Sequence, residues 1–148
     1  MNPSPTVALA NGVQMPLLGL GTWPMDNDAT ASAVKTAVSN GYRLFDTAES
    51  YGNEAGVGEG LRRTGIRRDE VFITSKFNKE WHGGGGVAQA FEASAKRLGV
   101  EYIDLFLIHW PDPAQDRYVE AFIGLEALLR EGKVRSIGTS NFKPKHLQ

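Results

Sequence analysis

The sequence of 148 residues contains no cysteine, which excludes disulfide bonds, thiol catalysis and zinc–thiolate sites. Neither sign of charge is in clear excess, since 16 Lys and Arg stand against 17 Asp and Glu. A formal charge of -1 gives no electrostatic reason to expect a nucleic acid or an anionic membrane as partner. No apolar run approaches the roughly 20 residues of a membrane span. We therefore expect no nucleic-acid, membrane or metal partner.

The first six residues contain two prolines and have neither the basic run nor the apolar stretch of a signal peptide. A cytoplasmic location is the expectation from this segment. Hydrophobic residues make up 41% of the chain and charged residues 22%, which is typical of a folded, soluble protein. The length suits one domain over residues 1–148.

A β-hairpin is predicted over residues 7–15, where two short apolar runs flank Asn11-Gly12, a dipeptide that favours a tight turn with positive φ. After it, short apolar runs alternate with amphipathic segments that end at glycines, a pattern typical of parallel strands joined by helices. We expect strands near residues 17–20, 44–48, 71–76, 103–108 and 134–139, and helices over 28–40, 54–63, 87–98 and 118–130.

Five strand–helix steps fit either an open doubly wound sheet or part of a barrel. The first strand leads into Gly19-Leu20-Gly21-Thr22-Trp23, which lacks the third glycine of a dinucleotide-binding fingerprint. Chemically distinctive residues follow several different strands, as they do in a barrel. We therefore predict an α/β fold that is part of a parallel (β/α)8 TIM-type barrel, limited to about five β/α steps. Because a complete barrel needs ~250 residues, and because a new helix begins near Pro144, we expect the chain to be cut short.

Four side chains near the carboxyl ends of these strands form a candidate catalytic set: Asp46, Tyr51, Lys76 and His109. Each alone is better explained as a salt-bridge partner, a loop tyrosine or a structural histidine. A phenol titrates near ~10, too high for ready proton donation at neutral pH, but an ammonium held by a carboxylate stabilises the phenolate. An imidazole facing the same point donates a hydrogen bond to the same substrate oxygen. Together they suit protonation of a carbonyl while hydride arrives from elsewhere.

Several segments, in order, are similar to those of the aldo-keto reductases, and most similar to the bacterial 2,5-diketo-gluconate reductase-like branch. They are GYRLFDTA at 41–48, YGNE at 51–54, VG at 57–58, TSK at 74–76, IDLFLIHWP at 103–111 and IGTSNF at 137–142. The resemblance extends over nearly the whole chain. It implies a (β/α)8 barrel and NADPH-dependent reduction of small aldehydes or ketones to alcohols.

The resemblance also implies roles for individual residues. Tyr51 would be the general acid, Asp46 and Lys76 would stabilise its phenolate form, and His109 would orient the substrate carbonyl. Cofactor contacts would come from Thr22, Asp46, Ser140 and Asn141. An apolar substrate pocket would be lined by Trp23, Trp81 and Trp110, of which Trp23 and Trp110 are favoured because each follows the carboxyl end of a strand.

The sequence departs from the family pattern in three ways. Thr139 stands where the family usually has an aliphatic residue, and residues 83–86 form a loop of four glycines. The part of the family pattern that follows the fifth strand is absent. The glycine loop is interpreted as a mobile connector of a substrate loop and not as a phosphate-binding loop. The family's segment for the adenosine and 2′-phosphate of NADPH would follow the fifth strand. The alternative is therefore a non-catalytic fragment or interaction module that self-associates through its first and fifth strands, since a partial barrel leaves their edges open.

Overall fold

The computed structural model describes residues 4–148. Residues 1–3, part of the segment from which a cytoplasmic location is expected, lie outside the described residues. The described chain contains a two-stranded antiparallel sheet and a five-stranded parallel sheet whose strands lie in sequence order. A doubly wound sheet reverses its strand order at a switch point, so this unbroken order is that of a barrel wall. The strands are β1 (Thr6–Ala8) and β2 (Gln14–Pro16) in the hairpin, then β3 (Gly19–Gly21), β4 (Leu44–Asp46), β5 (Phe72–Phe77), β6 (Ile103–Ile108) and β7 (Val134–Thr139).

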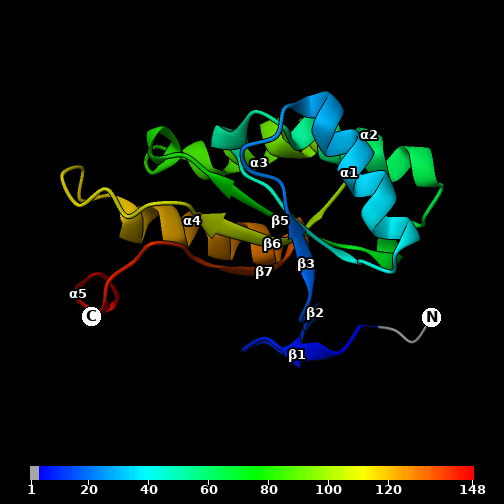
Figure 1. Ribbon diagram of the computed structural model, residues 1–148. Helices are drawn as coiled ribbons and strands as arrows, with labels where there is room; N and C mark the ends of the chain where they lie inside the picture. Colours follow the sequence, from blue (N-terminus) through cyan, green and yellow to red (C-terminus); the bar gives the residue numbers. More distant parts are fainter. Residues whose placement is uncertain (1–3) are drawn as a thin grey trace.

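Helices connect the successive parallel strands. Figure 1 shows α1, α2 and α3 above the strands and the hairpin β1–β2 below them. The α-helices are α1 (Asn27–Ser39), α2 (Glu54–Thr64), α3 (Gly86–Leu98), α4 (Tyr118–Arg130) and the short α5 (Pro144–Leu147); three 3-10 turns are η1 (Glu49–Tyr51), η2 (Arg68–Glu70) and η3 (Lys79–Trp81). None of the helices in residues 4–148 is both long and apolar enough to cross a membrane.

Local sequence signals account for the ends of these helices. Helix α1 begins after Asp26, whose carboxylate accepts a hydrogen bond from the Ala29 backbone N–H at 2.8 Å. The helices α1 to α4 each end next to a glycine with φ between +67° and +89°, a backbone conformation that glycine adopts without strain; these are Gly41, Gly65, Gly99 and Gly132. Amphipathic stripes and glycine stops therefore predicted these helices well.

The core lies between the sheet and its helices. Phe106 of β6 is fully buried, and its ring centroid lies 5.1 Å from that of Phe77 and 6.1 Å from that of Phe91 on α3. A parallel strand that is apolar almost throughout, as β6 is, is typically covered on both faces. The structure differs: Phe106 and Ile108 are fully buried on the helix side, whereas Leu105 and Leu107 of the opposite face are only partly buried.

Two boundaries near the N-terminus differ from the sequence prediction. The first parallel strand begins at Gly19, two residues later than expected, and Leu17 and Leu18 are 62% and 56% exposed. The Leu17 N–H instead donates to the Pro5 carbonyl at 2.8 Å, which extends the pairing of the hairpin. In the hairpin loop only Gly12 has a positive φ, and the Leu9 N–H donates to the Val13 carbonyl, so the loop is longer than a two-residue turn.

A buried carboxylate joins several strands at the amino end of the sheet. Asp104 of β6 is fully buried and accepts hydrogen bonds from Arg68 at 2.6 Å, from Arg135 at 2.8 Å and from the Ile73 N–H at 2.9 Å. The hairpin reaches the same end, since Asn11 Nδ2 donates to the Arg135 carbonyl at 2.8 Å. A buried carboxylate needs such partners, so Asp104 and its two arginines form a structural network at this end of the sheet.

Candidate active site

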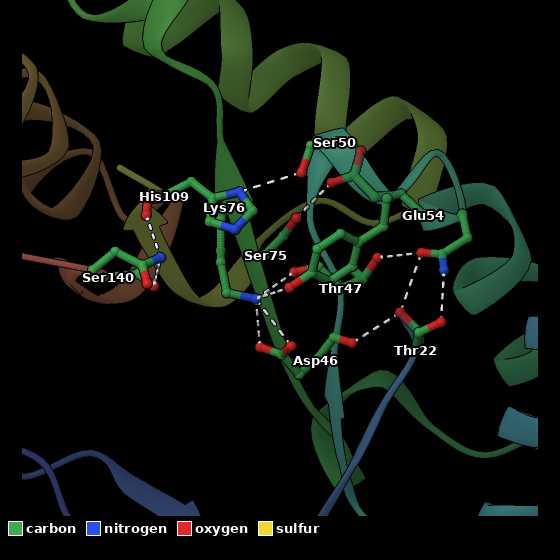
Figure 2. Close-up of polar contacts among 12 residues, drawn as sticks. Thr22, Asp46, Thr47, Ser50, Glu54, Ser75, Lys76, His109 and Ser140 are labelled. Carbon is green, nitrogen blue, oxygen red and sulfur yellow. Dashed lines mark hydrogen bonds and ion pairs between the residues drawn. The ribbon is translucent and has the colours of Figure 1, made fainter. Parts of the chain in front are cut away.

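The four candidate catalytic residues converge at the carboxyl end of the sheet. Asp46 is the last residue of β4, Lys76 lies in β5, and His109 follows β6 directly. Tyr51 is the last residue of the turn η1, which follows β4. Because the carboxyl ends of neighbouring parallel strands meet at one edge, strands that are far apart in sequence bring these groups together (Figure 2).

Lys76 is the centre of this cluster. Its ammonium donates hydrogen bonds to both carboxylate oxygens of Asp46, at 2.8 and 2.9 Å, and to the Thr47 carbonyl at 3.0 Å. It also donates to the Tyr51 hydroxyl oxygen at 3.4 Å. The Lys76 side chain is 8% exposed and that of Asp46 is 38% exposed, so the ion pair is open to solvent on the Asp46 side. Since the phenol oxygen accepts from Lys76, the phenolic proton is left for another acceptor.

His109, at the end of β6, faces Tyr51 across the end of β5. The two rings meet edge to face, with centroids 5.7 Å apart and an angle of 78° between their planes. Burial lowers the pKa of His109 below 6.5, and the positive charge of Lys76 lowers it further, although Asp46 acts in the opposite direction. His109 is therefore a neutral imidazole at neutral pH, with one ring nitrogen protonated.

The residues expected near a cofactor lie on two sides of this cluster. Thr22 is fully buried, and its hydroxyl donates to the Asp46 carbonyl at 3.0 Å and also lies 3.2 Å from Asn53 Oδ1. At the end of β7, Asn141 Nδ2 donates to the His109 carbonyl at 2.9 Å and to Ser140 Oγ at 3.1 Å. Thr22 thus supports the backbone of Asp46, and Asn141 ties β7 to His109.

The donors and acceptors at the end of β7 fit the carboxamide of a nicotinamide. Among residues 4–148, the hydrogen bonds of Asn141 use its amide nitrogen, which leaves its carbonyl oxygen as an acceptor. The Ser140 hydroxyl accepts from that nitrogen and keeps its own proton as a donor. A carboxamide needs one acceptor for its NH₂ group and one donor for its carbonyl oxygen, and these two side chains supply both.

The three tryptophans occupy different environments. Trp110 is 55% exposed, stacks on His109 with centroids 6.0 Å apart, and lines an open cleft of about 710 Å³ together with Asn141. Trp23 is 69% exposed and follows β3. The Trp81 indole N–H donates to both carboxylate oxygens of Glu49, at 3.0 and 3.1 Å. Of the three tryptophans, only Trp110 lines this cleft in the described chain, and a substrate-pocket role stays a prediction for all three.

Two glycines of the loop after Trp81 lie so close to neighbouring groups that a side chain would not fit without a shift. A side chain at Gly83 would meet the guanidinium of Arg117, and a Cβ at Gly86 would lie 2.7 Å from the Trp81 carbonyl oxygen. Gly84 and Gly85 have φ of +61° and +74° and have open space around them. Two of the four glycines are therefore closely packed, and the mobile role that the sequence suggested for this loop stays a prediction.

Sequence reasoning assigned no role to four polar residues around Tyr51. Asn53 is fully buried and accepts from Thr47 Oγ1 at 2.7 Å. Glu54 is 1% exposed and accepts from Ser75 Oγ at 2.5 Å and from Arg97 Nε at 2.6 Å. The other two, Glu49 and Ser50, belong to η1 together with Tyr51. The dense polar segment at 49–54, directly after an apolar strand, is the sequence signal that points to these residues.

Comparison with known proteins identifies the family. The model of the Aldo/keto reductase family matches residues 17–148, and the chain belongs to this family. It is 48% identical over 144 residues to a glyoxal reductase of Bacillus subtilis (strain 168). This alignment covers 97% of this chain and 51% of the relative.

Solved structures agree with this assignment. An aldo/keto reductase from Brucella melitensis superposes with a TM-score of 0.93 at 44% identity, over 97% of this chain and 56% of that one. A Bombyx mori aldo-keto reductase in complex with NADP gives a TM-score of 0.89 at 33% identity, over 99% of this chain and 53% of that one. The chain spans about half the length of the relatives it matches.

Proposed function

We propose that this site reduces small aldehydes or ketones to alcohols with NADPH, and that Tyr51 is the proton donor. The observation that carries the proposal is the contact of the Lys76 ammonium, held by Asp46, with the Tyr51 hydroxyl oxygen at 3.4 Å. An adjacent cation favours the phenolate that remains after proton donation. The class of reaction agrees with the family to which the chain belongs.

The proposed roles follow from the positions of the side chains. His109 donates a hydrogen bond to the substrate carbonyl oxygen, which polarises the C=O bond and places it next to Tyr51. Bound NADPH supplies a hydride for the carbonyl carbon. As the π electron pair of the C=O bond moves onto oxygen, Tyr51 transfers its proton to that oxygen and the alcohol is formed. Lys76 stabilises the phenolate until solvent returns a proton, and Asp46 holds Lys76 in place.

The proposal includes binding roles for the surrounding residues. Ser140 and Asn141 would hold the nicotinamide carboxamide, with Thr22 and Asp46 nearby. Trp110 and the other two tryptophans, Trp23 and Trp81, would contact the substrate beside His109. A cytoplasmic location is part of the same proposal and rests on the sequence alone.

The proposal is tested by following NADPH absorbance with glyoxal, the compound named for the Bacillus subtilis relative. Tyr51→Phe keeps the ring and removes the proton, so the rate is expected to fall at least ~100-fold. Tyr102→Phe is the matched control, because Tyr102 lies directly before β6, at the amino end of the sheet, where its ring stacks on Arg68. Equal rates for the Tyr51 variant and the unaltered chain would refute the assignment of Tyr51.

A second candidate function is self-association through the sheet edges. Within residues 4–148, β3 and β7 each pair with one strand only, and Leu17 and Leu18 are exposed beside β3. Open strand edges favour pairing with another chain. Sedimentation over a range of concentrations should then show dimers or larger species. Micromolar NADPH binding by a chain that stays monomeric would contradict this candidate.

A further inference from the structure

The turn η1 directs three consecutive side chains to three different parts of the site. Glu49 accepts from the Asn78 N–H at 3.0 Å, and Tyr51 receives the hydrogen bond from Lys76. Between them, Ser50 Oγ lies 3.3 Å from His109 Nδ1, a contact drawn in Figure 2. We propose that Ser50 is a positioning residue that donates to Nδ1 of His109 and thereby keeps the imidazole proton on Nε2. This inference rests on the proposed function, in which His109 donates to the substrate.

The choice of nitrogen matters because a neutral imidazole has one donor and one acceptor. If Nδ1 carried the proton, Nε2 would present a lone pair, and a lone pair repels a carbonyl oxygen. With Nδ1 occupied by Ser50, Nε2 is the nitrogen available to the substrate. The useful form is therefore the one with the proton on Nε2, and it requires a donor at Nδ1.

Ser50 is suited to be that donor. Among residues 4–148, the only hydrogen-bond partner of the Ser50 hydroxyl is Nδ1, so no other described protein group competes for its proton. A carboxylate at Nδ1 would draw the imidazole proton there. The two nearby carboxylates are occupied elsewhere, Asp46 by Lys76 and Glu49 by the Trp81 indole and the Asn78 N–H. The serine hydroxyl is therefore placed to donate to Nδ1 and so to favour the form with the proton on Nε2.

The position of Ser50 is fixed from both sides. Glu49 binds backbone and side-chain donors of the segment after β5, at Asn78 and Trp81. On the other side, the Tyr51 N–H donates to the Ala48 carbonyl at 3.1 Å and closes the turn. Ser50 itself is exposed, so a change to alanine removes a hydroxyl without opening a cavity in the core.

Long-range ¹H–¹⁵N NMR of the 148-residue chain, labelled at histidine, reads the tautomer directly. The chain has three histidines, and His109→Gln identifies the signals of His109. At neutral pH we expect His109 to be protonated at Nε2 and unprotonated at Nδ1. Ser50→Ala should at least double the fraction of the other tautomer, whereas Ser50→Thr retains the hydroxyl and the original tautomer. Ser32→Ala, an exposed serine of α1, is the matched control and should change nothing.

Kinetics with glyoxal and NADPH give the second readout. Ser50→Ala should lower kcat about fivefold, the factor that one neutral hydrogen bond is worth, with little change in KM, and Ser50→Thr should restore it. A protonated Nδ1 in the unaltered chain, or an unchanged tautomer in Ser50→Ala, would overturn the inference. Loss of reduction in every chain with the tautomer response intact would instead count against the proposed function alone.

Discussion

The two ends of the parallel sheet each contain a carboxylate paired with cations, and they use it differently. At the amino end, Asp104 is fully buried between Arg68 and Arg135, and both of its oxygens are occupied. At the carboxyl end, Asp46 is 38% exposed and pairs with Lys76, which in turn contacts Tyr51.

The chemistry of the cations explains the contrast. Arginine remains charged under all ordinary conditions and binds carboxylates with a rigid fork, which suits a permanent link between strands. Lysine is a compact charge with three donors, and here it serves a carboxylate, a backbone carbonyl and a phenol together. The amino end is thus suited to stability, and in the proposed function the carboxyl end holds the groups that exchange protons.

Removing the carboxylate at the amino end should have the largest effect on stability. Asp104→Ala leaves two guanidinium groups close together and without their partner, and should lower the free energy of unfolding by about 3 kcal/mol. Denaturant titration measures the loss. Asp69→Ala, which removes an exposed partner of Arg67, is the control and should produce no measurable change. A similar loss in both variants would mean that burial of Asp104 adds nothing.

Removing the cation at the carboxyl end should affect activity more than stability. Lys76→Met keeps the length of the side chain, and Asp46 is open enough to water to tolerate the loss of its partner. We expect reduction of glyoxal to fall at least ~100-fold, because the phenolate loses its stabilising charge. Lys133→Met, which breaks the surface pair with Glu92, should leave the rate unchanged. A mutant with full activity would show that Lys76 is only structural.

The smallest expected effect is a dependence of stability on acid. Burial lowers the pKa of His82 and of His109 below 6.5, so the folded chain resists protonation at both. Below pH 6.5 the unfolded chain therefore binds protons that the folded chain does not, and the free energy of unfolding decreases as the pH falls.

Unfolding curves at pH 7 and pH 5.5 measure this decrease. His82→Asn and His109→Gln should each make the decrease smaller, because each removes one of the two groups. The amino-end network around Asp104 contains arginines and no histidine, so Arg135→Lys should leave the pH dependence as it was. An equal pH dependence in all three variants would contradict the role of the two histidines.

The fold and the main cluster of the site follow from patterns that are visible in the sequence. Strands β6 and β7 and helix α4 have the predicted boundaries, because apolar runs and glycine stops define them. Asp46 and Lys76 were predictable as a pair, because each is a charged residue at the end of an apolar strand and neighbouring strands end at the same edge.

The contacts of η1 were not predictable in the same way. The Ser50–His109 contact depends on a three-residue 3-10 turn whose side chains follow no strand or helix period. The pairing of Glu49 with the Trp81 indole likewise joins two loops and leaves no periodic signal. The late start of β3 also escaped prediction, because Leu17 and Leu18 are as apolar as strand residues and yet are exposed.

The hydrogen bond between Asn11 and the Arg135 carbonyl has a consequence for the order of folding. It joins residues 124 positions apart, whereas each parallel strand pairs with the next one in sequence. Closing so long a loop costs more entropy than joining adjacent β/α units, so contacts of this kind form late. We expect the hairpin to dock after β7 has joined the sheet, and Asn11→Ala to accelerate unfolding while leaving the folding rate nearly constant.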